Sequence, residues 1–171
     1  MALSHYESPL GMITLASEGD SLVGLWFDGQ KYFGSSLEIS TDQYVPAREI
    51  PVLADTARWL DIYFRGIVPD FLPRLSPVGS PFRQRVWQSL LRIPYGSAVT
   101  YSDIAREIAS ERGLRSMSAQ AIGGAVGHNP ISLIIPCHRV IGSKGNLTGY
   151  AGGLDRKLSL LRMEGCMLSF D

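Results

Sequence analysis

A proline-rich stretch near the middle of the sequence limits how this chain can fold. Pro69, Pro73 and Pro77 are followed closely by Gly79. Proline lacks a backbone N–H and fixes φ, so neither a long helix nor a central strand can continue through this stretch. A chain of 171 residues is long enough for one sizeable domain or two small ones. We therefore predict two domains, residues 1–75 and 76–171, joined by this linker.

The first half has the pattern of a small α+β domain. Three strand-like runs at 3–7, 12–17 and 22–28 are separated by turn signals, which predicts an antiparallel meander. Pro51 suits the first turn of a helix, and the apolar positions that follow it share one helical face as far as Gly66. We expect this helix to cover the meander.

The second half is predicted to be mainly helical. Pro81 opens a helix that stops at Pro94. Thr100 is a candidate N-cap with Asp103 three residues later, and the helix that it begins is expected to run through Ile108.

A further helix is expected over Ser118–Val126, with Gly123 and Gly124 allowing the close approach of another backbone. Two short helices joined by the connector 109–117 indicate a helix-turn-helix, winged-helix-like motif. An ordinary αα-corner has the same pattern, and the connector is long for this motif.

Composition and charge set further limits on the protein. Apolar residues make up 45 % of the chain and the mean hydropathy is +0.07, which is typical of a globular protein with a real core. No secretion signal and no membrane span is recognisable, so we expect a cytoplasmic protein without a membrane partner. Residues 1–75 contain five Lys or Arg and ten Asp or Glu, whereas residues 76–171 contain eleven and six. The basic second half favours a polyanionic partner, and the alternative is a surface whose charge is uneven by chance.

The candidate nucleophile is Cys137, in the sequence Pro-Cys-His-Arg-Val at 136–140. The apolar run 131–135 before it predicts a strand, so that Cys137 would lie where the chain leaves a sheet. A thiol becomes a strong nucleophile as the thiolate, which positive charge or a partnered imidazole favours. The alternative is a buried cysteine that only packs.

A disulfide or a metal site is a weaker interpretation of the same residues. Cys137 and Cys166 could pair, but an intracellular chain of this size does not need a disulfide. His128 and His138 with the two cysteines lack the spacing of a zinc site, so we expect no metal.

The order of the motifs in the second half resembles that of the O6-alkylguanine-DNA alkyltransferase family. The resemblance covers residues 81–167, and the first half matches only in size and element pattern. The motifs that carry it are Pro81-Phe82, Gly96, Thr100-Tyr101, Gly123-Gly124, Asn129-Pro130, Pro136–Val140, Gly149–Gly153 and Leu160–Gly165.

This resemblance implies a protein that repairs DNA by taking the alkyl group of O6-alkylguanine, and possibly of O4-alkylthymine, onto its own Cys137. No cofactor is implied, and each molecule acts once because a thioether is a poor leaving group. The implied partner is double-stranded DNA that contains alkylated guanine, bound by a monomer. The alternatives are a non-catalytic protein that senses alkyl lesions in DNA and, more distantly, a Cys-His hydrolase. The first half has no cysteine, which excludes the structural zinc that some relatives carry there.

The resemblance also implies the roles of the site residues. Cys137 passes its proton through His138 toward Glu164, and Tyr101 supplies a hydroxyl near the guanine oxygen. Adjacent residues of a plain strand face opposite sides, so this relay needs a bend or a bridging water. Asn129 is the hinge between the recognition helix and the active-site segment. The implied walls of the base pocket are Val140, Tyr150, Ala151 and Gly152.

Several residues are expected to contact DNA. Gln120 stands where many relatives have an arginine that fills the gap left by the flipped base, and Arg112 or Arg115 of the long connector could compensate for the missing charge. Arg139 is a candidate phosphate contact or, alternatively, part of an internal ion pair. The other expected DNA contacts are Arg83, Ser102 and Ser143.

Overall fold

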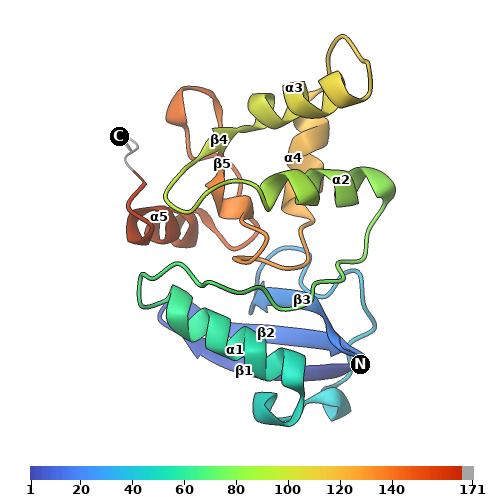
Figure 1. Cartoon of the computed structure of the whole chain (residues 1–171), viewed down its shortest axis with the longest axis vertical. Coiled ribbons are helices and arrows are strands. Elements are labelled where there is room, and N and C mark those ends of the chain that lie inside the picture. Colours follow the sequence, from blue (N-terminus) through green and yellow to red (C-terminus); the bar gives the residue numbers. More distant parts are fainter. Residues whose placement is uncertain (167–171) are drawn as a thin grey trace. The chain divides into compact units, whose positions relative to one another are not determined.

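The computed structural model describes residues 1–166; residues 167–171, at the end of the predicted second domain, lie outside the described part. The chain forms two compact units. The first unit contains residues 1–79 together with 130–134, and the second contains residues 80–129 and 135 onward (Figure 1). A short piece of the second half of the sequence therefore belongs to the first unit.

The first unit is built on a three-stranded antiparallel sheet. Strands β1 (Ala2–Ser8), β2 (Gly11–Glu18) and β3 (Ser21–Phe27) follow one another in the order β1-β2-β3. The predicted meander is therefore confirmed, with strand ends within a residue or so of those expected. All residues of β3 are buried, so this strand is covered on both faces.

Each face of the sheet has its own hydrophobic cover. Helix α1 (Pro51–Tyr63) begins at the predicted proline and packs on β2 and β3 through a buried stripe. This stripe contains Val52, Leu53, Thr56, Trp59, Leu60 and Tyr63. On the other face, Leu3 and Trp26 belong to a cluster that the segment 33–44 covers. The helix that we expected over the meander is thus present.

The outer edge of β3 is occupied by two separate pieces of chain. The Leu22 N–H donates to the Arg74 carbonyl at 2.7 Å, so the proline-rich stretch is tied to the sheet there. Farther along, the Leu25 N–H donates to the Pro130 carbonyl at 2.8 Å and the Ser132 N–H donates to the Leu25 carbonyl at 2.9 Å. An exposed sheet edge would offer these groups to other chains.

The prediction of a strand over residues 131–135 is wrong. Only Ile131 forms a β-bridge, to Leu25, and a turn follows. Leu133 has φ +70°, in the left-handed region that side chains rarely adopt, and this turns the chain away from the sheet. The apolar run instead reflects burial, because every residue from 129 to 141 is buried.

The second unit is mainly helical. Its helices are α2 (Pro81–Leu90), α3 (Tyr101–Glu111), α4 (Ala119–Gly127) and α5 (Leu154–Met163), and its short strands β4 (Val99–Thr100) and β5 (Val140–Ile141) pair in parallel. The predicted helices are confirmed, although α3 extends beyond Ile108 to Glu111. The mixed α+β class is also confirmed. No helix of the described residues is long and apolar enough to span a membrane.

Local capping sets where α3 and α4 begin. The Thr100 hydroxyl accepts the Asp103 N–H at 3.0 Å, and the Asp103 carboxylate accepts the Thr100 N–H at 2.8 Å. Aspartate thus completes a capping box that usually has Glu or Gln. In α4, the Ser118 hydroxyl accepts the N–H groups of Gln120 and Ala121.

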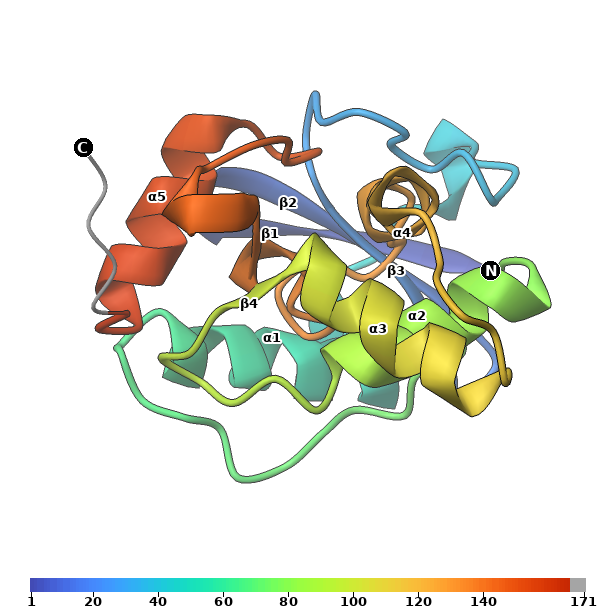
Figure 2. The ribbon, with the colours of Figure 1, turned by 90° about the horizontal axis from the view of Figure 1, so that it is seen from above.

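Helices α3 and α4 pack on each other and cross steeply, as Figures 1 and 2 show. The Trp87 indole N–H donates to the Ala125 carbonyl at 2.9 Å, which fixes α4 against α2. Gly123 and Gly124 were expected to allow the close approach of another backbone, but within the described part of the chain no other backbone approaches them. A Cβ atom at either position would meet nothing within 4 Å. These glycines lie beside open space.

Candidate active site

Cys137 lies in a single 3-10 turn, Cys137–Arg139, and is only 4 % exposed. Cys137 and His138 thus lie in a turn and not in a plain strand. Burial raises the pKa of the Cys137 thiol, whereas a hydrogen bond from the Asn129 side chain, the charge of Lys157 and the backbone N–H groups of residues 137 and 138 act in the opposite direction. Burial outweighs these contacts, so the thiol is protonated at neutral pH and needs a base to become the thiolate.

Glu164 holds two buried partners on one carboxylate. Its Oε1 lies 2.9 Å from His138 Nε2. Arg139 donates to the same carboxylate through Nε at 2.9 Å and through an NH2 group at 2.7 Å. The other end of the Arg139 guanidinium donates to the Ile93 carbonyl at 2.8 Å. His138, Arg139 and Glu164 thus form one internal ion-pair network.

Burial sets the charge of the His138 ring, and the Glu164 carboxylate sets which ring nitrogen carries the proton. Although burial alone would raise the pKa of Glu164, the hydrogen bonds from His138 and Arg139 hold it at about 2. Burial lowers the pKa of His138, so its ring is neutral at pH 7. An ionised carboxylate only accepts hydrogen bonds, so Nε2 carries the ring proton and Nδ1 is a proton acceptor. His138 therefore has the form of a general base.

Asn129 connects the end of α4 with the cysteine turn. It is 4 % exposed, and its side-chain amide donates to the Ile135 carbonyl at 2.8 Å. The side-chain to backbone bond expected of a hinge is present. The hydrogen bond of Asn129 to Cys137 places the same side chain at the thiol.

Lys157 in α5 is a site residue that the sequence reasoning missed. It is fully buried, and its ammonium donates to the carbonyls of Val140 at 2.5 Å, Gly149 at 3.1 Å and Thr148 at 3.3 Å. Burial lowers the pKa of Lys157 to about 8, and the charge of Cys137 raises it. The only signal in the sequence was a lysine inside an otherwise apolar helix face.

Two tyrosines complete the surroundings of the thiol. The Tyr101 hydroxyl lies 3.1 Å from the Thr148 carbonyl, and burial, with a smaller effect of Cys137, raises the pKa of Tyr101 to about 12. Burial and Cys137 also raise the pKa of Tyr150. Both hydroxyl groups therefore stay protonated at neutral pH.

The predicted pocket-wall residues lie on two segments of the second unit. Val140 directly follows the cysteine turn and is fully buried. Tyr150, Ala151 and Gly152 precede α5, and Gly152 is buried while the other two are half-buried. The Lys157 ammonium links these segments, because it binds the carbonyls of Val140 and Gly149.

The residues predicted to contact DNA differ in their exposure to solvent. Ser102, Gln120 and Ser143 are exposed, and Arg83 is partly buried at the start of α2. Arg139 is 8 % exposed and bound to Glu164, so it is not available at the surface as a phosphate contact. Arg139 is therefore part of an internal ion pair, which was the second of its two interpretations.

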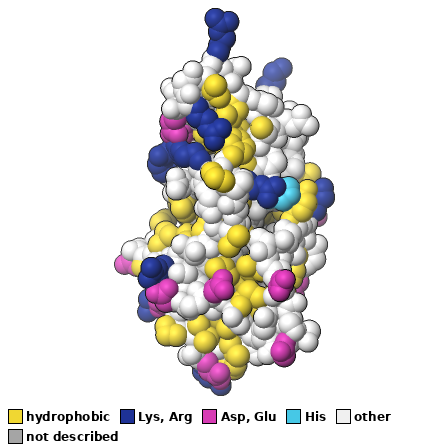
Figure 3. Space-filling view, turned by 90° about the vertical axis from the view of Figure 1, so that its right-hand side faces the viewer, with side chains coloured by type: hydrophobic (Ala, Val, Ile, Leu, Met, Phe, Trp, Pro, Cys, Tyr) yellow, Lys and Arg dark blue, Asp and Glu magenta, His cyan; other side chains and the backbone are white. Residues whose placement is uncertain are grey.

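Figure 3 shows basic side chains gathered around a strip of hydrophobic atoms over the second unit, while most acidic side chains on this face lie over the first unit. The uneven charge along the sequence thus becomes uneven charge on the surface. Among residues 1–166, no group of three or more His, Cys, Asp or Glu side chains could hold a metal ion.

The fold and the site define a protein that has a buried cysteine, a buried network of His138, Arg139 and Glu164, and the packed helices α3 and α4 in one unit. Family models match both halves: "6-O-methylguanine DNA methyltransferase, DNA binding domain" at residues 81–166 and "6-O-methylguanine DNA methyltransferase, ribonuclease-like domain" at residues 1–75. The chain belongs to the O6-methylguanine-DNA methyltransferase family.

Relatives and solved structures agree with this assignment. The methylated-DNA–protein-cysteine methyltransferase of Mycobacterium leprae is 42 % identical over 92 % of this chain and 88 % of its own length. That of Methanosarcina acetivorans is 41 % identical over 96 % of this chain and 99 % of its own. A crystal structure of the Mycobacterium tuberculosis protein in complex with DNA is similar with a TM-score of 0.81, at 37 % identity, and covers 99 % of this chain and 96 % of that one.

Proposed function

We propose that this protein repairs DNA by moving the alkyl group of O6-alkylguanine irreversibly to Cys137. The single observation that carries the proposal is the buried Cys137, whose neighbour in sequence, His138, pairs with the buried Glu164. The thiol, the base and the carboxylate all belong to the unit that matches the DNA-binding family model. The names of the relatives support the same reaction.

The first step is removal of the thiol proton. We infer that His138 Nδ1 receives this proton, directly or through a water molecule. The Glu164 carboxylate accepts a hydrogen bond from the Nε2–H group and stabilises the imidazolium. Asn129 and Lys157 stabilise the thiolate that forms.

The second step is displacement at carbon. Sγ of Cys137 forms a bond to the alkyl carbon as the bond from that carbon to O6 breaks, and the electron pair stays on the guanine oxygen. The Tyr101 hydroxyl is the proposed donor to the leaving base, because its raised pKa keeps it protonated at neutral pH. Guanine then takes up a proton and leaves.

The product explains why we expect one reaction per molecule. The alkyl group becomes part of a thioether, which is a poor leaving group, so the thiol is not regenerated. Binding alone, as in a lesion sensor, would need neither the thiol nor its base. The non-catalytic alternative is therefore not favoured.

Binding to DNA is proposed to involve the α3–α4 pair, with α4 as the recognition helix. The open space beside Gly123 and Gly124 lets a nucleic acid backbone approach α4 closely. A base must leave the duplex stack to reach a buried thiol, so we infer base flipping, with Gln120 next to the vacated position. Double-stranded DNA with alkylated guanine, a monomeric protein and a cytoplasmic location remain predictions.

Intact-mass spectrometry after incubation with a duplex oligonucleotide that carries one O6-methylguanine tests the proposal. We expect the protein to gain the mass of one methyl group in place of a hydrogen, with a stoichiometry of one. Cys137→Ser should gain nothing, and Cys166→Ser, the matched control at the second cysteine, should react like the wild type. Tight binding to the oligonucleotide without any gain in mass would instead indicate a lesion sensor.

A further inference from the structure

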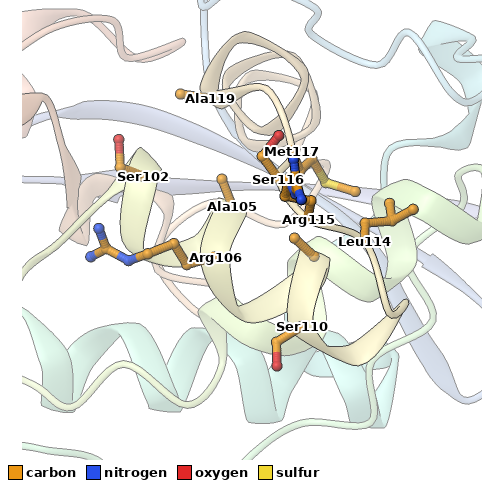
Figure 4. A pocket seen from close by; sticks show the side chains of 10 residues that line it. Ser102, Ala105, Arg106, Ser110, Leu114, Arg115, Ser116, Met117 and Ala119 are labelled. Carbon is orange, nitrogen blue, oxygen red and sulfur yellow. The ribbon is translucent and has the colours of Figure 1, made fainter.

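A hollow in the second unit lies between α3 and the segment 112–118 that connects α3 to α4 (Figure 4). Its volume is about 360 Å³. Ser102, Arg106 and Ser110 line it from α3, and Arg115 and Ser116 line it from the connector. None of the predicted thiol-site residues contributes to it.

The lining is basic and rich in hydroxyl groups. Two arginines and three serines make up half of the lining, and the other half is apolar: Ala105, Ala109, Leu114, Met117 and Ala119. No acidic side chain of the described residues lines the hollow, so its charged groups are all cations and favour an anion. Arginine and serine are among the residues whose side chains contact DNA phosphates.

The two arginines differ in how they are engaged. Arg106 forms an ion pair with Asp103, and its side chain is 75 % exposed. Arg115 is exposed and has no hydrogen-bond or ion-pair partner within residues 1–166. An unpaired guanidinium at the rim of a polar hollow is free to bind an external anion without first breaking an internal contact.

The start of α4 adds a favourable field. Ala119, the first residue of α4, also lines the hollow. The N-terminal end of a helix carries partial positive charge, which favours an anion nearby. The hollow therefore combines a free guanidinium, a second arginine, hydroxyl groups and a helix N-terminus.

We propose that this hollow binds a backbone phosphate of the DNA, with Arg115 as the principal contact. The proposal rests on the function inferred above and adds a site to it. It also offers a cation to replace the charge that Gln120 lacks, because Arg115 precedes α4 in the connector. If the hollow instead bound an acidic segment of a protein, DNA binding would not depend on Arg115.

The salt dependence of duplex binding tests this site. Each phosphate contact contributes about 0.9 to the slope of log K against log salt concentration. We expect Arg115→Ala to reduce the magnitude of the slope by about 0.9 and to weaken binding at about 0.1 M salt by roughly 5- to 10-fold. Arg115→Lys, which keeps the charge, should retain most of the slope. Arg48→Ala is the matched control, since it removes one exposed arginine from the first unit.

Alkyl transfer from the free base O6-methylguanine separates this proposal from the proposed function. A free base has no phosphate, so Arg115→Ala should react with it at the wild-type rate. An unchanged slope in Arg115→Ala, with normal transfer, would overturn the phosphate site alone. If the wild type took no alkyl group from either duplex DNA or the free base, the proposed function itself would fail.

Discussion

His138 Nε2 lies 2.9 Å from Glu164 Oε1, and the same Glu164 carboxylate forms an ion pair with Arg139. One buried carboxylate therefore sets both the proton position of the general base and the charge balance of the site. A change at Glu164 must affect reactivity and stability together.

Glu164→Gln should slow alkyl transfer strongly. Glutamine cannot stabilise an imidazolium by charge, and a positioned general base contributes about 10²- to 10⁴-fold to a rate. We expect a loss within that range in single-turnover measurements, together with a lower free energy of unfolding, because the Arg139 charge stays buried without its partner. Glu111→Gln, at an exposed carboxylate that pairs with Arg85, is the control. Equal transfer rates in both variants would argue against the relay.

Acid should destabilise the protein through Glu164. A carboxyl group whose pKa is lowered on folding contributes stability that is complete above its unfolded pKa, near 4.5, and is lost as the pH falls toward about 2. The shift corresponds to a contribution on the order of 3 kcal/mol. Urea unfolding at several pH values should show this loss in the wild type and a flatter profile in Glu164→Gln. Parallel profiles would show that Glu164 titrates normally.

Lys157→Met should slow transfer by removing positive charge near the thiolate. Because the pKa of Lys157 is about 8, the wild type itself loses this charge as the pH rises through that value. The ratio of the wild-type rate to the variant rate should therefore shrink above about pH 8. Single-turnover rates across this range measure the ratio, and Lys31→Met, at an exposed lysine of the first unit, is the control. A ratio that stays constant with pH would mean that Lys157 acts only by binding carbonyls.

Asn129→Ala should both destabilise the protein and raise the pKa of Cys137. The variant removes one of the two donors to the Ile135 carbonyl, which keeps the Cys137 N–H at 2.8 Å, so the loss is that of a single hydrogen bond, about 0.5–1.5 kcal/mol. In a chain of this size the melting temperature should fall by roughly 1–6 °C. Titration of the thiol with an alkylating reagent measures the second effect, and Asn146→Ala, at an exposed position, is the control. An unchanged thiol pKa would restrict Asn129 to a hinge.

Tyr101→Phe tests the proposed donor to the leaving base. The variant keeps the ring but loses the hydroxyl that contacts the Thr148 carbonyl. We expect slower transfer with nearly unchanged affinity for DNA, since the hydroxyl acts on charge that develops only during bond breaking. Rapid-quench measurement at saturating DNA separates the two quantities. A change in affinity alone would make Tyr101 a binding residue.

The features that were correctly predicted are those encoded within one or two turns of chain. Pro51 and Pro81 begin helices because their fixed φ suits a first turn, and Thr100 with Asp103 forms its capping box from residues three apart. The three strands of the first unit follow from short apolar runs between turns. Such signals need no knowledge of distant contacts.

The features that were missed depend on distant parts of the chain. Lys157 is a site residue because carbonyls from positions 140, 148 and 149 converge on it, and no spacing in the sequence reveals this convergence. The run 131–135 is as apolar as a buried strand, but the left-handed Leu133 gives it another path. The role of Arg139 was left open because a surface arginine and a buried one look alike in sequence.

The two pieces of chain along the edge of β3 have a consequence for dividing the protein. The first unit needs residues 130–134, which are encoded beyond α4, to satisfy the Leu25 amide and carbonyl. A fragment that stops at residue 79 would leave both groups exposed to other strands. A protease cut in the proline-rich stretch would therefore yield two fragments that stay associated, and the two halves cannot be exchanged between relatives like independent modules.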